Sequence, residues 1–283
     1  MPSDVDWDHL RLFLAVMRAD SLRQAAEHVG LSHPTVRRRL ETLESALGIR
    51  LFDRRTDGIH PTPDAAGLLE FAEQMETSVL ALRRQARNAD PEMRGRIRVT
   101  APNPLVTDLL MPTLGSLWER WPQIDLHVDA SYNVADLALQ ESDIALRAVP
   151  CGTAPDDELV GRKAATSYHA VYGEGEQWLG WWGGERDQAW IADTPFPDAP
   201  IRGRFESPEL QRAACKAGLG LTRLPCFFAE PHLRRRSDPQ PRFDIWVVVH
   251  PDLRGSPRLR MVRDELVAEL ARLQPRLAGS PEA

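Results

Sequence analysis

Residues 21–45, with the sequence SLRQAAEHVGLSHPTVRRRLETLES, carry the clearest structural pattern of the chain. The spacing of apolar residues predicts two short amphipathic helices that meet at Gly30, because a glycine readily takes the left-handed conformation that ends a helix. Ser21 and Ser32 precede the two helices, and serine is a favourable N-cap residue. A helix, a glycine turn and a basic second helix form the layout that places one helix in the major groove of DNA.

The second helix carries most of the candidate DNA-binding residues. Val36, Leu40 and Leu43 are expected to face inward, which leaves the basic residues on the other face. Guanidinium groups suit contacts to both guanine and phosphate. The alternative is a solvated arginine run on an ordinary surface helix, but its position after Gly30 favours DNA contact. The candidate DNA-binding residues of this region are Ser21, Ser32, His33, Pro34, Thr35, Arg37, Arg38 and Arg39.

A β-hairpin is predicted directly after these helices. Residues 49–52 have the pattern of a strand, residues 53–58 that of a turn, and residues 59–61 that of a return strand. The pair at 57–58 is Asp-Gly, a strong hairpin signal. Arg54 and Arg55 would then lie over the DNA backbone, or alternatively pair with the neighbouring aspartates.

A long helix is predicted from Thr62, since a capping threonine is followed by proline and an acidic residue. Its apolar residues recur at alternating steps of three and four, the spacing of a helix–helix seam. We therefore expect a dimerisation helix, although a helix packed on its own domain is the alternative. A symmetric dimer would present two DNA-reading helices to a pseudo-palindromic site. The candidate dimerisation residues are Leu68, Ala72, Met75, Val79 and Leu82.

The remaining two thirds of the chain alternate between strand and helix patterns, which favours a parallel α/β sheet. In such sheets ligands bind beyond the carboxyl ends of the strands. Strands are expected at 95–100, 124–128, 143–146, 168–172, 219–224 and 244–250, and helices at 105–118, 134–140, 209–217 and 257–273.

Composition limits the functions that the chain can have. The formal net charge of the 283 residues is -6, so DNA binding needs a local basic patch. The three cysteines lack metal-ligand spacing, and neither a disulfide framework nor a metal site is expected. The N-terminus does not have the pattern of a secretory signal, and no apolar run approaches membrane-spanning length, so we expect a cytoplasmic protein without a membrane partner. We expect no enzyme, because the nucleophile-elbow, phosphate-loop, zinc-protease and dinucleotide motifs do not occur.

Two sets of motifs resemble one known family, the LysR-type transcriptional regulators. Residues 7–67 resemble the family's winged helix-turn-helix domain, although His33 and Arg37 stand where the family usually has glutamine and serine. Residues 91–283 resemble its effector-binding domain, which is similar in fold to periplasmic binding proteins. The matching motifs are HLRLFLAV (9–16), SLRQAAEHVGLSHPTV (21–36), LETLESALGIRLFDR (40–54), TPDAAG (62–67), GRIRVTAP (95–102), LLMPTLGSLWERWPQIDLHV (109–128), SDIALR (142–147), KAGLGLTRLP (216–225) and WVVVHP (246–251).

The resemblance implies an α+β multi-domain chain. It comprises a winged helix-turn-helix domain (1–61), a dimerisation helix (62–90) and a periplasmic-binding-protein-like α/β domain (91–283). The last domain would have two subdomains, one formed by 91–160 with 258–283 and the other by 161–257. The implied function is a transcriptional regulator whose promoter binding a small molecule modulates. A cleft-containing enzyme or a solute-binding protein with an appended DNA-binding domain are the alternatives.

The resemblance also implies the partners: double-stranded promoter DNA, a small-molecule effector, and further copies of the chain in a homodimer or homotetramer. A contact with RNA polymerase is a further option. No cofactor is expected beyond the non-covalently bound effector. The effector-binding residues that the resemblance implies are Thr100, Asn103, Ser131, Arg147 and Thr194. Alternative roles are a helix cap for Thr100, a turn for Ser131 and a surface ion pair for Arg147.

Two further groups of residues allow two interpretations each. Four tryptophans, Trp178, Trp181, Trp182 and Trp190, either form an aromatic wall for a ring-bearing ligand or pack a small subdomain, and packing is favoured. Cys215 and Cys226 fall in patterns that favour buried, unreactive thiols over a redox sensor.

Overall fold

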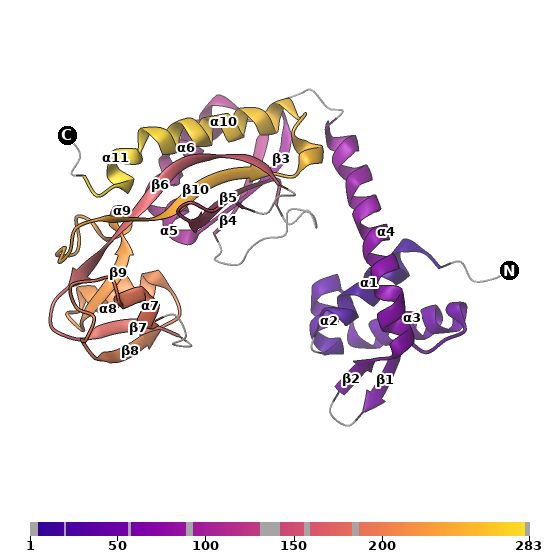
Figure 1. The fold of residues 1–283 in the computed structure, drawn as a ribbon. Helices are drawn as coiled ribbons and strands as arrows, with labels where there is room; N and C mark the ends of the chain where they lie inside the picture. Colours follow the sequence, from indigo (N-terminus) through magenta and orange to yellow (C-terminus); the bar gives the residue numbers. More distant parts are fainter. Residues whose placement is uncertain are drawn as a thin grey trace. The chain divides into compact units, whose positions relative to one another are not determined.

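The computed structural model describes residues 5–19, 21–55, 58–88, 93–130, 142–155, 159–182 and 187–280. The chain divides into two compact units, Met1–Arg83 and Arg84–Ala283 (Figure 1). Within the described ranges, no helix combines the length and the apolar composition that crossing a bilayer requires.

The N-terminal unit packs three helices, a hairpin and the first part of a long helix around one apolar core. Phe13 contacts Phe52 of the hairpin with ring centroids 5.9 Å apart. Thr62 begins the long helix as predicted, because its hydroxyl accepts a hydrogen bond from the backbone N–H of Ala65 at 3.2 Å. The elements are α1 (Trp7–Met17), α2 (Leu22–Val29), α3 (His33–Leu47), β1 (Phe52–Arg55), β2 (Gly58–Pro61) and α4 (Pro63–Asn88) (Figure 1).

The hairpin begins later than the sequence pattern predicted. The first strand, β1, starts at Phe52, where the expected strand 49–52 ends, and it pairs antiparallel with β2 in the register Phe52↔Pro61. The reason is a contact distant in sequence. The Glu44 carboxylate accepts hydrogen bonds from the backbone N–H groups of Leu51 and Phe52, at 2.7 and 3.1 Å, so these groups bond to α3.

The C-terminal unit is built on an eight-stranded sheet in the order β4-β3-β5-β10-β6-β9-β7-β8. The predicted strands are present, but the sheet is mixed: the expected parallel pairing holds for β3 with β4 and β5 and for β7 with β8 and β9, and it is wrong for the strands between them. β3 runs parallel to β4 and β5, whereas β10 runs antiparallel to both β5 and β6. The strands are β3 (Gly95–Ala101), β4 (Ile124–Ala130), β5 (Ile144–Pro150), β6 (Val160–Gly173), β7 (Trp178–Trp181), β8 (Ile201–Phe205), β9 (Leu221–Pro225) and β10 (Gln240–Val249).

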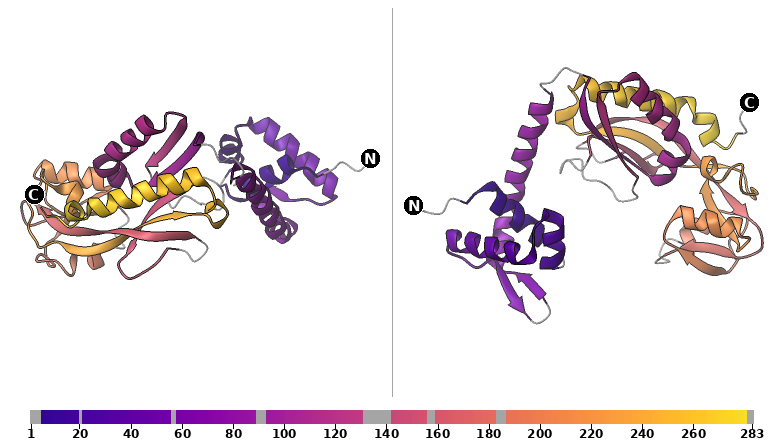
Figure 2. Two further views of the ribbon diagram at one scale, coloured as in Figure 1. Left: turned by 90° about the horizontal axis from the view of Figure 1, so that it is seen from above. Right: turned by 180° about the vertical axis from the view of Figure 1, so that it is seen from behind.

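Helices cover the sheet, and α6 lies beside α10 over one of its faces (Figures 1 and 2). The predicted helix at 105–118 is a continuous helical path whose middle, Val106–Leu110, is a π-helix. The predicted helix at 134–140 lies outside the described residues. The helices are α5 (Asn103–Leu105), η1 (Val106–Leu110), α6 (Met111–Arg120), α7 (Asp187–Ile191), α8 (Pro208–Lys216), α9 (Cys226–Ala229), η2 (Pro251–Leu253), α10 (Pro257–Arg272) and α11 (Gln274–Leu277).

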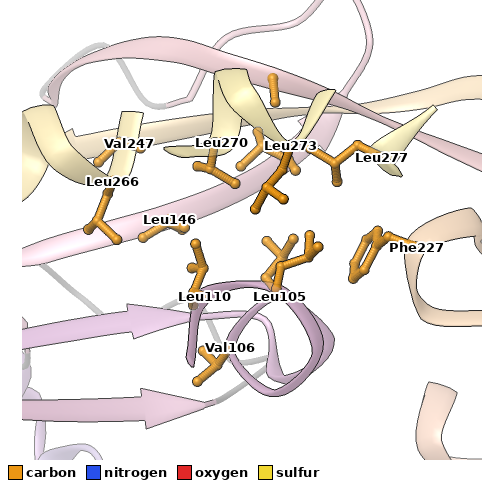
Figure 3. Close-up of a cluster of buried hydrophobic side chains, with 14 of the residues drawn as sticks. Leu105, Val106, Leu110, Leu146, Phe227, Val247, Leu266, Leu270, Leu273 and Leu277 are labelled. Carbon is orange, nitrogen blue, oxygen red and sulfur yellow. The ribbon is translucent and has the colours of Figure 1, made fainter. Parts of the chain in front are cut away.

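Leucines dominate the core between the sheet and its helices. Figure 3 shows Leu105 and Leu110 of the α5–η1 segment facing Leu266 and Leu270 of α10, with Leu146 of β5 beside them. The segment that follows β3 is therefore anchored by buried side chains, which holds the carboxyl end of β3 in place.

Candidate functional site

The junction between α2 and α3 has the geometry that the sequence predicted. Gly30 takes a left-handed conformation with φ of 68°, and the Leu31 N–H donates to the Ala26 carbonyl at 3.0 Å. The Ser32 hydroxyl accepts a hydrogen bond from the Thr35 N–H at 3.4 Å, and Ser21 accepts one from the Gln24 N–H at 3.2 Å. The serine caps fix the N-termini of α2 and α3, so the start of α3 is held in a defined position.

The face of α3 opposite the core carries the exposed cations. Val36, Leu40 and Leu43 are buried in the N-terminal core. Arg37 lies along the helix, where its Nε is 3.1 Å from a Glu41 carboxylate oxygen. Arg38 is exposed, and its guanidinium forms no ion pair with any residue that the structure describes. Arg38 is therefore the most available cation in the middle of α3.

The first turn of α3 adds further exposed groups. His33 and Pro34 are exposed there, whereas Thr35 and Arg39 are half-buried. Arg54 and Arg55 belong to β1, but their side chains lie outside the described part, so their role at the DNA backbone stays a prediction.

Glu44 is a positioning residue that the sequence pattern does not predict. It is half-buried, and its two hydrogen bonds to the Leu51 and Phe52 N–H groups tie the base of the hairpin to α3. Nothing local in the sequence shows this contact, because a glutamate on a polar helix face is ordinary. Glu44 sets the position of the hairpin relative to α3.

The outward face of α4 differs from the predicted seam at two positions. Ala72 is only 2% exposed and lies in the N-terminal core, so it is not free to contact a partner and its assignment to the seam is corrected. Phe71, which the prediction omitted, is 64% exposed. Met75 is 47% exposed and Leu82 is 68% exposed. We call Phe71, Met75 and Leu82 the α4 stripe; Leu68 and Val79 beside it are half-buried.

In the C-terminal unit, two of the predicted effector residues lie near the carboxyl end of β3, Thr100 within the strand and Asn103 at the start of α5. Thr100 is 1% exposed, and its hydroxyl has no hydrogen-bond partner among the described residues. Three residues along the chain, the Asn103 amide donates to the Glu209 carboxylate of α8 at 2.9 Å. The carboxyl end of β3 therefore holds one hydroxyl without a partner among the described residues, and the start of α5 carries a polar bridge to α8.

A second bridge, between Arg212 and Asp108, joins α8 to the η1 segment. Their side chains approach to 2.9 Å, and the Arg212 guanidinium lies 3.6 Å from the centroid of the Phe228 ring. Neither bridge follows from the sequence pattern, because each joins positions more than a hundred residues apart.

The other predicted effector residues are less clearly part of one site. Arg147 is half-buried on β5, opposite Trp246 of β10. The Thr194 hydroxyl donates to the Ile191 carbonyl at 2.6 Å, so it stabilises the local turn. Ser131 lies outside the described residues.

Comparison with known proteins matches both parts of the chain to one family. Residues 7–66 match the bacterial regulatory helix-turn-helix proteins of the lysR family, and residues 91–176 match the LysR substrate binding domain. A probable hydrogen peroxide-inducible genes activator from Mycobacterium xenopi is 34% identical over 148 residues, which cover 51% of this chain and 78% of that protein. The chain belongs to the LysR family.

Other LysR-family proteins match over nearly the whole chain. The HTH-type transcriptional regulator CrgA of Neisseria meningitidis serogroup C (strain 8013) is 27% identical over 93% of this chain and 96% of its own length. The solved structure of CrgA from Neisseria meningitidis has a TM-score of 0.53 at 26% identity and covers 94% of this chain and 99% of that one. The full-length Vibrio cholerae virulence activator AphB shares the fold, with a TM-score of 0.56 at 19% identity over 93% of this chain and 99% of that one.

The chain spans about half the length of two further curated relatives, 51% of one and 50% of the other. The expected family and the expected fold class, a helix-turn-helix domain followed by an α/β effector-type domain, are confirmed by the two domain matches and by the CrgA structure.

Proposed function

We propose that this LysR-family chain is a transcriptional regulator that places α3 in the major groove of promoter DNA. The observation that carries the proposal is the division of α3 into two faces. Val36 and its neighbours bury one face in the core, Arg38 is exposed on the opposite face, and His33 is exposed in the first turn. Residues near the N-terminus of such a helix reach base edges, and arginine suits guanine and phosphate.

The α4 stripe supports assembly of the regulator as a homodimer. Phe71, Met75 and Leu82 are separated by steps of four and seven residues, which is heptad spacing. Exposed apolar residues at this spacing favour pairing with the same stripe of a second chain. A homotetramer and a contact with RNA polymerase are extensions of the same proposal. Acting on bacterial promoters, the regulator would work in the cytoplasm.

The carboxyl end of β3 supports binding of a small molecule, for which we expect neither a cofactor nor a metal. The unpartnered hydroxyl of Thr100 is a buried polar group that a ligand could satisfy, and Asn103 already bridges to α8. Arg147 offers a positive charge on β5. An effector would act by binding one arrangement of the chain more tightly than another, which shifts the population and hence the affinity for DNA.

The test compares Arg38→Ala with Arg120→Ala, which removes an exposed arginine that pairs with Glu265 in the C-terminal unit. Duplexes that the wild-type protein selects from a random library serve as the target in gel-shift titrations. Loss of Arg38 should weaken binding by about 1–3 kcal/mol, or roughly 5- to 150-fold, whereas the control should bind like wild type. Equal affinities of wild type and Arg38→Ala would contradict the proposal.

A further inference from the structure

A carboxylate in the C-terminal unit lies between two arginines that come from different strands. Asp193, which follows α7, accepts a hydrogen bond from Arg223 Nη1 at 2.6 Å through Oδ1. Its Oδ2 accepts from Arg242 Nη1 at 2.8 Å and from Arg223 Nη2 at 3.3 Å. Arg223 belongs to β9 and Arg242 to β10. We call this pair of arginines the two-arginine site.

Burial is very unequal across these contacts. The Arg223 side chain is 2% exposed, whereas the Asp193 side chain is 50% exposed. Arg223 is also anchored by a hydrogen bond from Nη1 to the Trp190 carbonyl at 2.9 Å. A buried guanidinium is strongly destabilising without an anion, and the hydrogen bond from Arg223 lowers the pKa of the Asp193 carboxyl. The site therefore needs an anion, which Asp193 supplies from a half-exposed position in contact with water.

The surroundings of the two-arginine site are aromatic. The guanidinium groups of Arg223 and Arg242 lie 5.4 and 5.6 Å from the centroid of the Trp190 ring. The His169 ring meets Trp190 edge-on with centroids 5.6 Å apart, and Phe243 lies 5.3 Å from His169. His169 is buried, whereas the Trp190 ring is half-buried beside both arginines, so Trp190 is the ring that suits a flat aromatic ligand.

The balance of charge and hydrogen bonds also leaves capacity for a ligand. Burial, with the two arginines adding to it, lowers the pKa of His169 to about 3, so this imidazole is neutral at pH 7. Two cations thus face the one carboxylate of Asp193. In the part of the chain that the structure describes, the buried Trp190 Nε1 and His169 Nδ1 have no hydrogen-bond partner.

We propose that the two-arginine site binds a small aromatic carboxylate and that Asp193 occupies it when the ligand is absent. The ligand carboxylate takes the place of the Asp193 carboxylate on Arg223 and Arg242, and its ring lies against Trp190. No covalent bond forms or breaks, since one anion replaces another. The proposal rests on the effector-binding role of the C-terminal unit, and it assigns to that role residues outside the set that the family resemblance implied.

The first experiment titrates benzoate into the full-length chain by isothermal titration calorimetry, with Asp193→Asn and a matched control. Asp125→Asn is the control, because Asp125 is a 55%-exposed aspartate that pairs with Arg96 at 3.1 Å. Removing the internal competitor should raise the benzoate affinity at least about tenfold over wild type, whereas the control should leave it unchanged. Benzamide, which has the same shape without the charge, should show no gain.

A second experiment removes one arginine of the two-arginine site and compares it with a control. Arg242→Gln should lower the benzoate affinity at least about fivefold, whereas Arg120→Gln should not. Asp193→Asn leaves Arg223 with less compensation, so thermal unfolding is followed as well, and benzoate should raise the unfolding midpoint of this variant more than that of wild type.

The proposal is overturned if Asp193→Asn binds benzoate no better than Asp125→Asn, or if benzamide and benzoate bind equally. It is also overturned if benzoate leaves the unfolding midpoint of Asp193→Asn unchanged. These titrations contain no DNA. A chain that fails to bind DNA would refute the proposed regulator function without altering the benzoate result, and the converse also holds.

Discussion

The α4 stripe makes a quantitative prediction about dimer stability. Leu82 is 68% exposed, and full burial of a leucine side chain contributes about 1.5–3 kcal/mol. Covering the exposed two thirds in a partner would contribute about 1–2 kcal/mol per side chain, and the symmetry of a dimer doubles it to about 2–4 kcal/mol. Leu82→Glu loses this contribution and places two carboxylates in the seam. The dimer dissociation constant should therefore rise by at least about 30- to 700-fold.

Sedimentation equilibrium over a range of protein concentrations measures this constant directly. Thr77→Glu is the matched control, because Thr77 is exposed on the same helix but lies away from the stripe. The control should dimerise like wild type, and both variants should keep the wild-type circular dichroism spectrum, since neither side chain is buried. If Leu82→Glu and Thr77→Glu have the same dissociation constant as wild type, the α4 stripe is not the dimer contact.

Three further predictions concern single residues. Glu44→Ala should lower the free energy of unfolding by about 1.5–3 kcal/mol, because two backbone N–H groups lose a charged acceptor. Glu41→Ala is the exposed control, and an equal loss in both variants, measured by urea unfolding, would refute the positioning role. Thr100→Val should leave the stability of the ligand-free chain unchanged or slightly higher, since the buried hydroxyl has no partner among the described residues. A loss above about 1 kcal/mol in thermal unfolding would contradict this reasoning. His169 has its pKa lowered to about 3 by burial, so protons bind the unfolded chain more tightly, and its contribution to stability is present above pH 6.5 and falls as the pH drops towards 3. Between pH 7 and pH 5 the wild type should lose about 2 kcal/mol more stability than His169→Asn, and equal losses in urea unfolding at the two pH values would contradict the burial of a neutral imidazole.

The N-terminal unit could be predicted closely because its signals are local. The caps at Ser21 and Ser32 and the left-handed Gly30 involve residues within a few positions of each other, and all three are present in the structure. The start of β1 was misplaced because it depends on Glu44, which reaches across seven and eight positions to backbone groups. A pattern of apolar residues contains no information about such a contact.

The seam on α4 shows a different limit. Residues at steps of three and four satisfied the heptad rule, but α4 also packs on the core of its own unit. Apolar residues occur on this packed face as well as on the outward face. Only the burial of each side chain in the structure distinguishes the two faces: Ala72 faces the core, while Phe71 faces outward. The direction of β10 could not be predicted for a similar reason, because its apolar run is compatible with either orientation in the middle of a sheet.

Neighbouring residues determine the helix ends and the basic face of α3, and the sequence predicted both. It also predicted the order of most strands and helices, but not β7 and β8. The partners of Glu44, the packing of Ala72, the antiparallel β10 and the meeting of Arg223, Arg242 and Asp193 emerged only in the folded chain. Each of these joins groups that the chain brings together through packing. Their energies depend on burial and distance, and neither quantity is encoded in the spacing of residues along the chain.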